Sequence, residues 1–388
     1  MIAAAELRDR LAGLEPIGRG PDGTTRLAWT EELAAAEAWF AEQASAAGLA
    51  VERDPAGSLW AVPRVAGPWW ATGSHLDTVR RGGRFDGALG VASGFAVAER
   101  AAAPVAVIAF ADEEGARFNT PTFGSRALVG RLDVDDVLAR TDDDGVVLAD
   151  AMREAGADPA GLAGAPHRLD RLRGFLELHI DQTRDLAVAG APAGAVRELA
   201  SRMRLAVALH GRADHAGTTP RDERRDALAA AARLIVAADD LAGADRGFLV
   251  TAARILVSPN AFTTVPAEVR LWIDGRTPDD VRLRAWRTGL EERAAALAAR
   301  AGVAIDVATA SHAAGVAFDP GVLDALGGLP RLVCFAGHDA GIVAERRPAG
   351  MVLVRNPSGV SHAPEEEVSL EDAAAGANAL LRALEALA

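Results

Sequence analysis

The segment Gly73-Ser-His-Leu-Asp-Thr-Val-Arg-Arg-Gly-Gly-Arg-Phe-Asp-Gly-Ala-Leu-Gly90 carries one imidazole, His75, and two carboxylates, Asp77 and Asp86. It follows the apolar run 69–71, so the pattern predicts a buried strand that leads into an exposed, glycine-rich functional loop. An imidazole and two carboxylates in one loop indicate half of a metal site. The remaining ligands are expected far along the chain, because such sites are assembled from the ends of several strands.

The residues that follow predict the α/β alternation of strand, loop, helix and strand. Residues 90–100 form an alanine-rich stretch typical of a helix, and residues 105–110 are a short, fully apolar run typical of a central strand. That run leads into Asp112, Glu113 and Glu114. Side chains alternate along a strand, so one glutamate could hold a metal while its neighbour serves as a base. A solvated acidic turn is the alternative.

A third strand is expected at residues 174–182, where Glu177, His179 and Asp181 would share one face. A histidine flanked by two carboxylates on its own face could be oriented by them as a metal ligand, although a lone strand histidine is usually structural. His167 is expected to be a surface histidine. His312 has no acidic residue beside it in the sequence and is left unassigned.

The middle of the chain predicts a separate domain. Residues 189–194 read as a linker, and residues 202–307 follow the order strand, helix, strand, strand, helix, strand, which is that of a compact α+β sandwich. The last part returns to α/β character and closes with an amphipathic helix over 370–386. The first domain is therefore expected to be discontinuous, with residues 1–190 and 304–388 forming one domain and residues 191–303 the inserted one.

Composition excludes several kinds of chemistry. The 388 residues carry a net charge of -13, and no basic block occurs, so a nucleic-acid partner is not expected. All 41 basic residues are arginine and tyrosine is absent, which excludes a P-loop lysine, a Schiff-base lysine and a tyrosine acid. No apolar run is long enough to span a membrane. The charged N-terminus and the single cysteine, Cys334, favour a cytoplasmic location.

Taken together, these segments resemble the M20 family of metal-dependent amidohydrolases, and specifically its carbamoylase branch. That branch contains N-carbamoyl-L-amino-acid hydrolases, allantoate amidohydrolases and β-ureidopropionases. The matching motifs occur in family order from residue 73 to residue 366. They are Gly73-Ser-His-Leu-Asp-Thr-Val, Gly82-Gly-Arg-Phe-Asp-Gly-Ala-Leu-Gly, Asp112-Glu-Glu-Gly-Ala-Arg-Phe, Phe123-Gly-Ser-Arg-Ala-Leu, Glu177-Leu-His-Ile-Asp-Gln, His215-Ala-Gly-Thr-Thr-Pro, Pro259-Asn-Ala, Val265-Pro-Ala-Glu-Val, Asp274-Gly-Arg, Gly337-His-Asp-Ala and Ser361-His-Ala-Pro-Glu-Glu.

The resemblance implies a mixed-sheet, zinc-peptidase-like catalytic domain with an inserted α+β domain that serves as lid and dimerisation module. It also implies two divalent ions, with zinc favoured and manganese, cobalt or nickel possible, since histidine and carboxylate ligands suit all four. Glu113 would be the general base that takes a proton from the attacking water, and Asp77 would orient His75 by a hydrogen bond. The implied metal ligands are His75 and His179 for one ion, Glu114 and His362 for the other, and Asp86 as the bridge between them.

The short spacing from His75 to Asp86 favours the carbamoylase branch over the peptidases of the family. The resemblance further implies a homodimer through the inserted domain, with His215 polarising the scissile carbonyl in the partner's site. A small carboxylate substrate would be bound by Arg276, which offers a bidentate fork, together with neighbouring polar groups. For Arg276 the alternative is a surface salt bridge, and for His338 a structural role. The substrate-binding candidates are Gln182, His215, Asn260, Arg276 and His338.

Two stretches depart from the family pattern, namely Asp181-Gln-Thr-Arg184 and Cys334-Phe-Ala336. The metal ligands are complete, so the departures concern the substrate pocket. Hydrolysis of a carbamoyl or ureido C–N bond in a small carboxylate is therefore the leading hypothesis. The alternatives are an N-acyl-amino-acid amidohydrolase or dipeptidase on the same scaffold and, more distantly, a non-catalytic protein that binds a metal or a ligand.

Overall fold

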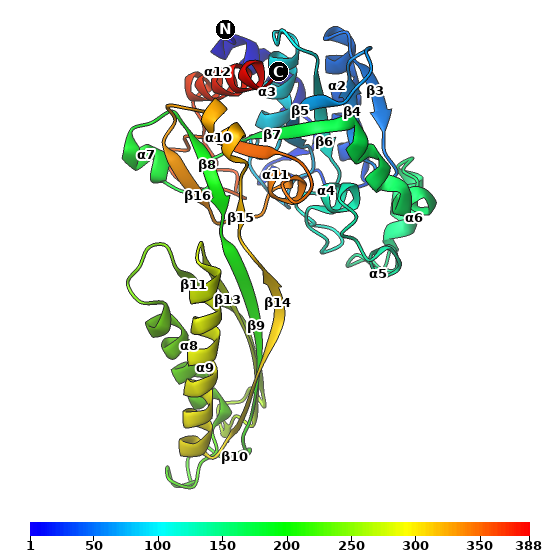
Figure 1. The fold of residues 1–388 in the computed structure, drawn as a ribbon. Coiled ribbons are helices and arrows are strands. Elements are labelled where there is room, and N and C mark those ends of the chain that lie inside the picture. The colour runs from blue at the N-terminus through cyan, green and yellow to red at the C-terminus, as the bar shows by residue number, and fades with distance from the viewer. The chain divides into compact units, whose positions relative to one another are not determined.

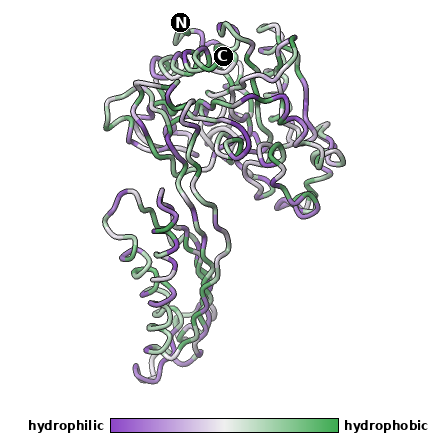
Figure 2. The backbone as a smooth tube through the Cα atoms, in the orientation of Figure 1, coloured by the Kyte–Doolittle hydropathy of each residue, from purple (hydrophilic) through white to green (hydrophobic).

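The computed structural model describes residues 1–388, which fold into two compact units (Figure 1). Unit 1 comprises Met1–Arg197, Ala317–Leu332 and Gly337–Ala388, and unit 2 comprises Glu198–Val316 and Val333–Ala336. Unit 1 is thus discontinuous in sequence. Hydrophobic stretches occur along the chain in both units (Figure 2). No helix has both the length and the apolar character that crossing a membrane requires.

The core of unit 1 is a mixed sheet of nine strands in the order β15-β8-β17-β7-β5-β6-β4-β3, with β16 also paired to β8. The four central strands, β17, β7, β5 and β6, run parallel to one another, whereas β8 is antiparallel to β17, β4 to β6 and β3 to β4. Central strands buried on both faces explain the apolar runs in the sequence. The strand bounds are β3 (Ala50–Arg53), β4 (Leu59–Val62), β5 (Trp69–His75), β6 (Val105–Phe110), β7 (Leu172–Ile180), β8 (Ala193–Leu199), β15 (Val316–Ala317), β16 (Arg331–Cys334) and β17 (Ala349–Val354).

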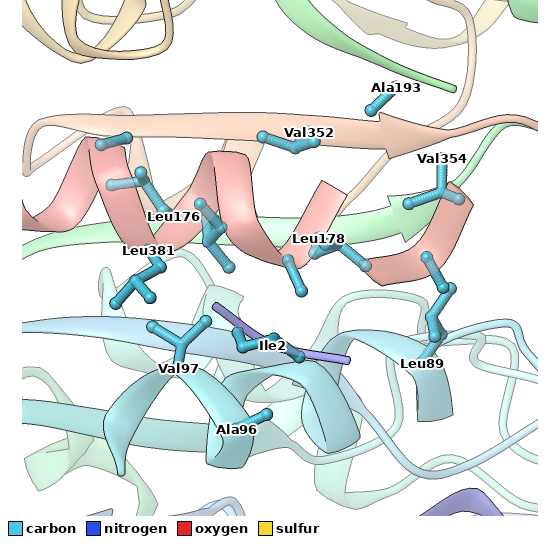
Figure 3. Close-up of a cluster of buried hydrophobic side chains, with 14 of the residues drawn as sticks. Ile2, Leu89, Ala96, Val97, Leu176, Leu178, Ala193, Val352, Val354 and Leu381 are labelled. Carbon is cyan, nitrogen blue, oxygen red and sulfur yellow. The ribbon is translucent and has the colours of Figure 1, made fainter. Parts of the chain in front are cut away.

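Helices cover this sheet and close its core. Figure 3 shows Leu89 and Val97 of α3 packed with Leu176 and Leu178 of β7, beside Leu381 of α12. A second cluster lies between α2, α3 and strands β4 and β6. A short hairpin, β1 (Arg19–Gly20) with β2 (Gly23–Thr24), follows the first helix. The helices of unit 1 are α1 (Ala4–Leu14), α2 (Glu31–Ala46), α3 (Ala88–Ala98), α4 (Phe123–Leu128), α5 (Val134–Leu138), α6 (Leu148–Glu154), η1 (Pro159–Arg171), α7 (Asp185–Ala189), α10 (Pro320–Ala325), α11 (Asp339–Val343) and α12 (Leu370–Leu387).

Unit 2 is a four-stranded antiparallel sheet in the order β11-β13-β9-β14 with two long helices on one face (Figure 1). Its core forms between the helices and the sheet, and includes Leu205, Leu234 and Trp286. Strands β10 and β12 pair with each other in a separate two-stranded antiparallel sheet, and β10 follows β9 after a short loop. The elements are β9 (Ser201–His210), β10 (Asp214–His215), α8 (Ala227–Ala242), β11 (Leu249–Ser258), β12 (Thr264–Val265), β13 (Glu268–Thr277), α9 (Asp280–Ala301) and β14 (Ala304–Ala313).

Two sequence-based assignments differ from the structure. The boundary expected between residues 303 and 304 lies further along the chain, because β14 pairs with β9 over its length and so belongs to unit 2. The stretch 189–194, expected to be a linker, contains the start of β8, whose residues 193–196 pair antiparallel with β17. Its alanines and glycine gave no strand signal, since β propensity is low for both residue types.

Candidate metal centre

The residues of the predicted metal set lie at the carboxyl ends of central parallel strands or in the segments that follow them, with Asp86 in the loop between β5 and α3. His75 ends β5, and His179 lies one residue before the end of β7. Glu114 follows β6, and His362 lies in the segment after β17. Because the carboxyl ends of parallel strands lie on one edge of the sheet, residues that are far apart in sequence meet there.

Asp86 lies at the centre of this cluster, and its two carboxylate oxygens face different partners. Its Oδ1 is 2.9 Å from His179 Nε2 and 3.3 Å from His75 Nε2. Its Oδ2 is 3.6 Å from His362 Nε2, which in turn is 3.4 Å from Glu114 Oε2. The donor atoms therefore form two groups that could each hold a metal ion, His75-Asp86-His179 and Asp86-Glu114-His362.

Main-chain carbonyls orient the two buried imidazoles. His75 Nδ1 lies 3.0 Å from the carbonyl oxygen of Asp77, and His179 Nδ1 lies 3.1 Å from that of Ile180. A ring that donates from Nδ1 presents the lone pair of Nε2, which is the atom that faces Asp86 in both residues. The flanking carboxylates that the sequence suggested for His179 do not perform this task. Asp181 instead accepts hydrogen bonds from the N–H groups of Thr183 and Leu186.

Asp77 is adjacent to the cluster, but its carboxylate has a different role from the expected one. Its two oxygens accept the main-chain N–H groups of Glu113 and Glu114, each at 3.1 Å. The distance from its Oδ1 to His75 Nδ1 is 3.7 Å, too long for a hydrogen bond. The Asp77 side chain therefore fixes the backbone of the two glutamates, and only its carbonyl orients His75.

Glu113 and Glu114 face different partners although neither lies on a strand. Strand β6 ends at Phe110, so the side-chain alternation of a strand, which the sequence suggested, does not set their directions. Asp112, which precedes them, has a φ of 48°, a left-handed conformation that is uncommon for residues other than glycine. Glu113 is buried, and its Oε2 lies 3.8 Å from His75 Nε2. Glu114 reaches His362, as described above.

The glycine after Asp86 is required by close packing. Gly87 has a φ of 66°, and a Cβ atom there would lie 2.5 Å from the ring of His75.

The N–H groups of Phe85 and Asp86 both donate to Glu366 Oε1, at 2.8 and 3.0 Å. Glu366 thus holds the loop that presents Asp86. Sequence reasoning assigned it no role, and its place in the motif that begins at Ser361 was the only available signal.

Two polar neighbours complete the surroundings of Asp86 Oδ2. The Oγ of Ser361 donates to this oxygen at 3.1 Å, and Nε2 of Gln182 does so at 3.3 Å. Gln182 was predicted to bind substrate and does lie beside the cluster. Ser361 was missed, because a serine before a histidine has no distinctive pattern.

The electrostatics of the cluster are those of a site with excess buried negative charge. Burial raises the pKa of Glu113 well above its usual range, and the Asp339 and Glu114 carboxylates add to this effect. Burial and Asp86 raise the pKa of Glu114 to about 8. Although burial opposes its charged form, the Asp86 carboxylate raises the pKa of His179 to about 9. Cations bound among these carboxylates would offset this cost.

The residues present fit divalent metal ions. His75 Nε2 and Glu114 Oε1 are buried and have no hydrogen-bond partner in the protein. Imidazole nitrogens and carboxylate oxygens are the donors that zinc and related ions prefer. The two buried atoms without a hydrogen-bond partner and the shared Asp86 therefore fit a metal-binding site.

His338 lies directly beside this cluster. It is buried, both ring nitrogens lack a hydrogen-bond partner, and its ring centroid is 4.4 Å from that of His179. With Glu177 and His179 it forms a third group of potential ligands. Glu177 is already engaged, since it accepts hydrogen bonds from the Ser74 hydroxyl and the Ala340 N–H group. Burial lowers the pKa of His338 well below its usual range, and His179 adds to this effect.

The other predicted substrate residues belong to unit 2. His215 is exposed, and its Nδ1 accepts the N–H groups of Gly217 and Thr218, at 3.0 and 3.1 Å. A neutral ring with Nδ1 as acceptor carries its proton on Nε2. Asn260 is also exposed.

Arg276 is held by groups of its own unit. Its Nε donates to Asp274 at 2.7 Å, and its Nη1 donates to the carbonyl of Phe335 at 2.8 Å. These two contacts fix the plane of the guanidinium. The ion pair with Asp274 was the alternative that the sequence left open, and it does not exclude binding of a further anion.

His167 and His312 lie away from the cluster. His167 is on the surface, as expected. His312 was thought to lack acidic neighbours, but its Nε2 is 2.6 Å from Asp280 Oδ1. That contact joins the start of α9 to the end of β14, two positions that lie 32 residues apart in the sequence.

Comparison with known proteins gives consistent results. Residues 71–386 match the family described as Peptidase family M20/M25/M40. The chain is 36% identical to the N-carbamoyl-L-amino acid amidohydrolase of Geobacillus stearothermophilus, with 98% of this chain and 97% of that protein covered. It is 31% identical to the allantoate amidohydrolase of Bacillus subtilis, with 98% and 97% covered. Among solved structures, an amidase of the hydantoinase/carbamoylase family from Burkholderia multivorans superimposes with a TM-score of 0.88 at 30% identity, covering 99% of this chain and 97% of that one.

Proposed function

Because this chain belongs to peptidase family M20/M25/M40, we propose that it is a metal-dependent amidohydrolase that cleaves the C–N bond of an N-carbamoyl or ureido carboxylate. The observation that carries this proposal is Asp86, whose two oxygens face two separate groups of potential ligands beside the buried Glu113. The names of the similar proteins support non-peptide amides, namely N-carbamoyl amino acids and allantoate, as the substrate class.

In this proposal the two groups hold two divalent ions, with zinc as the first choice, and Asp86 is shared between them. Such ions, when bound, lower the pKa of water and polarise the carbonyl that is attacked. His75 and His179 would serve as neutral ligands through Nε2, because their Nδ1 atoms meet main-chain carbonyls. Glu114 and His362 would hold the second ion.

Glu113 would be the general base. It takes a proton from the attacking water and returns it to the leaving nitrogen, as expected of a carboxylate with an elevated pKa. The new C–O bond forms at the carbamoyl carbon, and the C–N bond breaks. Cleavage at the amino-acid nitrogen leaves carbamate, which decomposes to ammonia and carbon dioxide. Asp77 supports this step by holding the backbone of Glu113.

Five polar residues are proposed to bind substrate. Gln182 and His338 lie beside the metal ligands, whereas His215, Asn260 and Arg276 lie in unit 2. Arg276 would bind the substrate carboxylate, because a guanidinium matches a carboxylate in geometry. His215 would donate from Nε2 to the oxyanion that develops on the carbonyl, since its Nδ1 is occupied as an acceptor.

We also propose a homodimer through unit 2, in which His215 serves the partner's site. Strand β11 is an edge strand of its sheet, and it exposes Leu249, Ile255 and Leu256. A long exposed apolar edge favours pairing with another chain. Light scattering should give the mass of a dimer, and two charged substitutions on β11, I255K and L256K, should convert it to a monomer with reduced turnover. A monomeric wild-type protein with full activity would exclude this arrangement.

A matched pair of substrates tests the substrate class. Metal-reconstituted protein is given the N-carbamoyl and the N-acetyl form of one L-amino acid, and release of the free amino acid is measured. Allantoate and β-ureidopropionate are tested by ammonia release. We expect kcat/KM for at least one ureido compound to exceed that for the acetyl compound by roughly tenfold or more, a difference of about 1.4 kcal/mol in transition-state binding. A strong preference for the acetyl compound or for a dipeptide would overturn the proposal and favour an N-acyl-amino-acid amidohydrolase or dipeptidase.

A further inference from the structure

A cavity of about 240 Å³ lies in unit 1, outside the metal centre. Helix α1, the residues on either side of hairpin β1-β2, the loop before Asp86 and the start of α12 enclose it. Its wall combines apolar and basic side chains. Leu11, Phe85 and Leu370 are among the apolar residues of the wall, and Arg8, Arg26 and Arg84 are its basic residues.

Arg26 is the unusual member of this wall. Only 2% of the residue is exposed. Its Nε donates to the carbonyl of Leu76 at 2.8 Å and its Nη1 to that of Ile17 at 3.3 Å, both of which are neutral groups. Its Nη2 has no hydrogen-bond partner in the protein. A buried guanidinium that donates only to neutral carbonyls is costly unless an anion compensates its charge.

The charged groups around Arg26 do not supply the anion that its buried guanidinium requires. Burial lowers the pKa of Arg26 to about 10, and the charge of Asp77 partly opposes that shift. The guanidinium therefore stays protonated at neutral pH. Asp77 already accepts the N–H groups of Glu113 and Glu114. The one carboxylate on the cavity wall, Glu15, pairs with Arg19 and Arg84, which both lie nearer the surface.

We propose that this cavity binds a small carboxylate with an apolar body. The basic residues supply the anion partner, and charge-assisted hydrogen bonds from arginine to a carboxylate are among the strongest available in proteins. The apolar residues favour a hydrocarbon portion over inorganic phosphate. The volume is below the 300–1,000 Å³ that is typical of drug-sized ligands, so the ligand is no larger than a single ring or a short aliphatic chain.

The cavity adjoins the loop that carries Asp86. Phe85 forms part of its wall, and the N–H groups of Phe85 and Asp86 share Glu366 Oε1 as their acceptor. A carboxylate could also bind to metal in the neighbouring centre. The test must therefore separate the two sites by a substitution that alters only the cavity.

Ala12 provides that substitution, because it lines the cavity, lies on α1 and is exposed. A tryptophan there (A12W) places its ring in the cavity without disturbing a buried side chain. Ala5 is exposed on the same helix and does not line the cavity, so A5W is the matched control. Arg26→Met tests the charge directly, with the thermal midpoint as a check on folding.

The probes are benzoate and its neutral isostere benzamide, titrated into metal-loaded protein by calorimetry. We expect saturable binding of benzoate, at least about tenfold weaker binding of benzamide, loss of benzoate affinity by about tenfold or more in A12W, and affinity within about twofold of wild type in A5W. A folded Arg26→Met variant should bind the two probes alike. Benzoate binding that is unchanged in A12W, equal binding of benzamide, or no saturable binding of benzoate would each overturn the proposal.

Discussion

The two potential metal groups share Asp86 but differ in their access to solvent. In the first group the side chains of His75 and His179 are 0% and 1% exposed, and main-chain carbonyls fix both rings. In the second, His362 is 49% exposed and adopts a φ of 57° in a loop. The two groups thus have similar ligand types but differ in solvent exposure. In the proposed binuclear site the buried group would be preorganised to retain an ion, whereas the open group would leave room for solvent or substrate beside a second ion.

Replacement of the shared ligand should have the largest effect. Asp86→Ala removes an oxygen from each group and leaves two buried imidazoles facing each other without a carboxylate. We expect metal content to fall in both groups, and kcat/KM to drop by at least about 10³-fold, a loss typical of essential catalytic groups. Metal analysis after desalting and a kinetic assay provide the measurements. If Asp86→Ala kept full metal content, the shared role of Asp86 would be wrong.

Replacement of single ligands should distinguish the two groups by the metal that each variant retains. His179→Ala removes a fixed, buried ligand, so the first group should lose its ion. His362→Ala removes a half-exposed ligand that water can replace, so the variant should keep the buried ion and bind the second one weakly. Mass spectrometry of the metal content should therefore give less metal for His179→Ala than for His362→Ala when both are washed with the same mild chelator. Equal losses would show that solvent access does not distinguish the groups.

Asp77 should have a smaller effect, because its carboxylate accepts hydrogen bonds from the main chain of Glu113 and Glu114 and contacts no metal-ligating atom at hydrogen-bond distance. Asp77→Asn replaces one of the two acceptor oxygens by an amide donor, which disturbs the backbone of Glu113 or Glu114. Loss of such a supporting partner typically costs about 10–100-fold in activity or metal affinity. We expect kcat to fall within that range while the buried group keeps its ion. A loss of the ion bound by His75 would instead indicate that Asp77 acts mainly on that imidazole.

The sequence was sufficient to predict part of the site, because parallel strands deliver their carboxyl ends to one edge. The loop with His75 and Asp86 indicated half of a metal site, whereas the complete ligand set, with Glu114, His179 and His362, was implied by the resemblance to the M20 family. The structure brings all of these ligands close to Asp86. The long helices and central strands were also predictable, since their apolar periodicity is strong. The start of β8 was not, because its alanines and glycine lack that pattern.

The predictions that were wrong concern which atom of a residue makes a contact. A sequence pattern places Asp77 near His75, but it does not tell whether the carbonyl or the carboxylate meets the ring. It likewise places Asp181 near His179, although that carboxylate accepts hydrogen bonds from the turn before α7. Glu366 was missed because its contact with Phe85 and Asp86 joins segments about 280 residues apart. Such contacts depend on tertiary packing, which a local motif does not encode.

The most direct test of the account concerns Glu113. Glu113→Gln preserves the size of the side chain and removes the base, while the ligands of both groups remain. Metal content and turnover of an N-carbamoyl amino acid are measured on the same preparation of variant and wild type. We expect that metal content is unchanged and that kcat falls by about 10²–10⁴-fold, the range for loss of a general base. Unchanged turnover with metal bound would contradict the proposed mechanism.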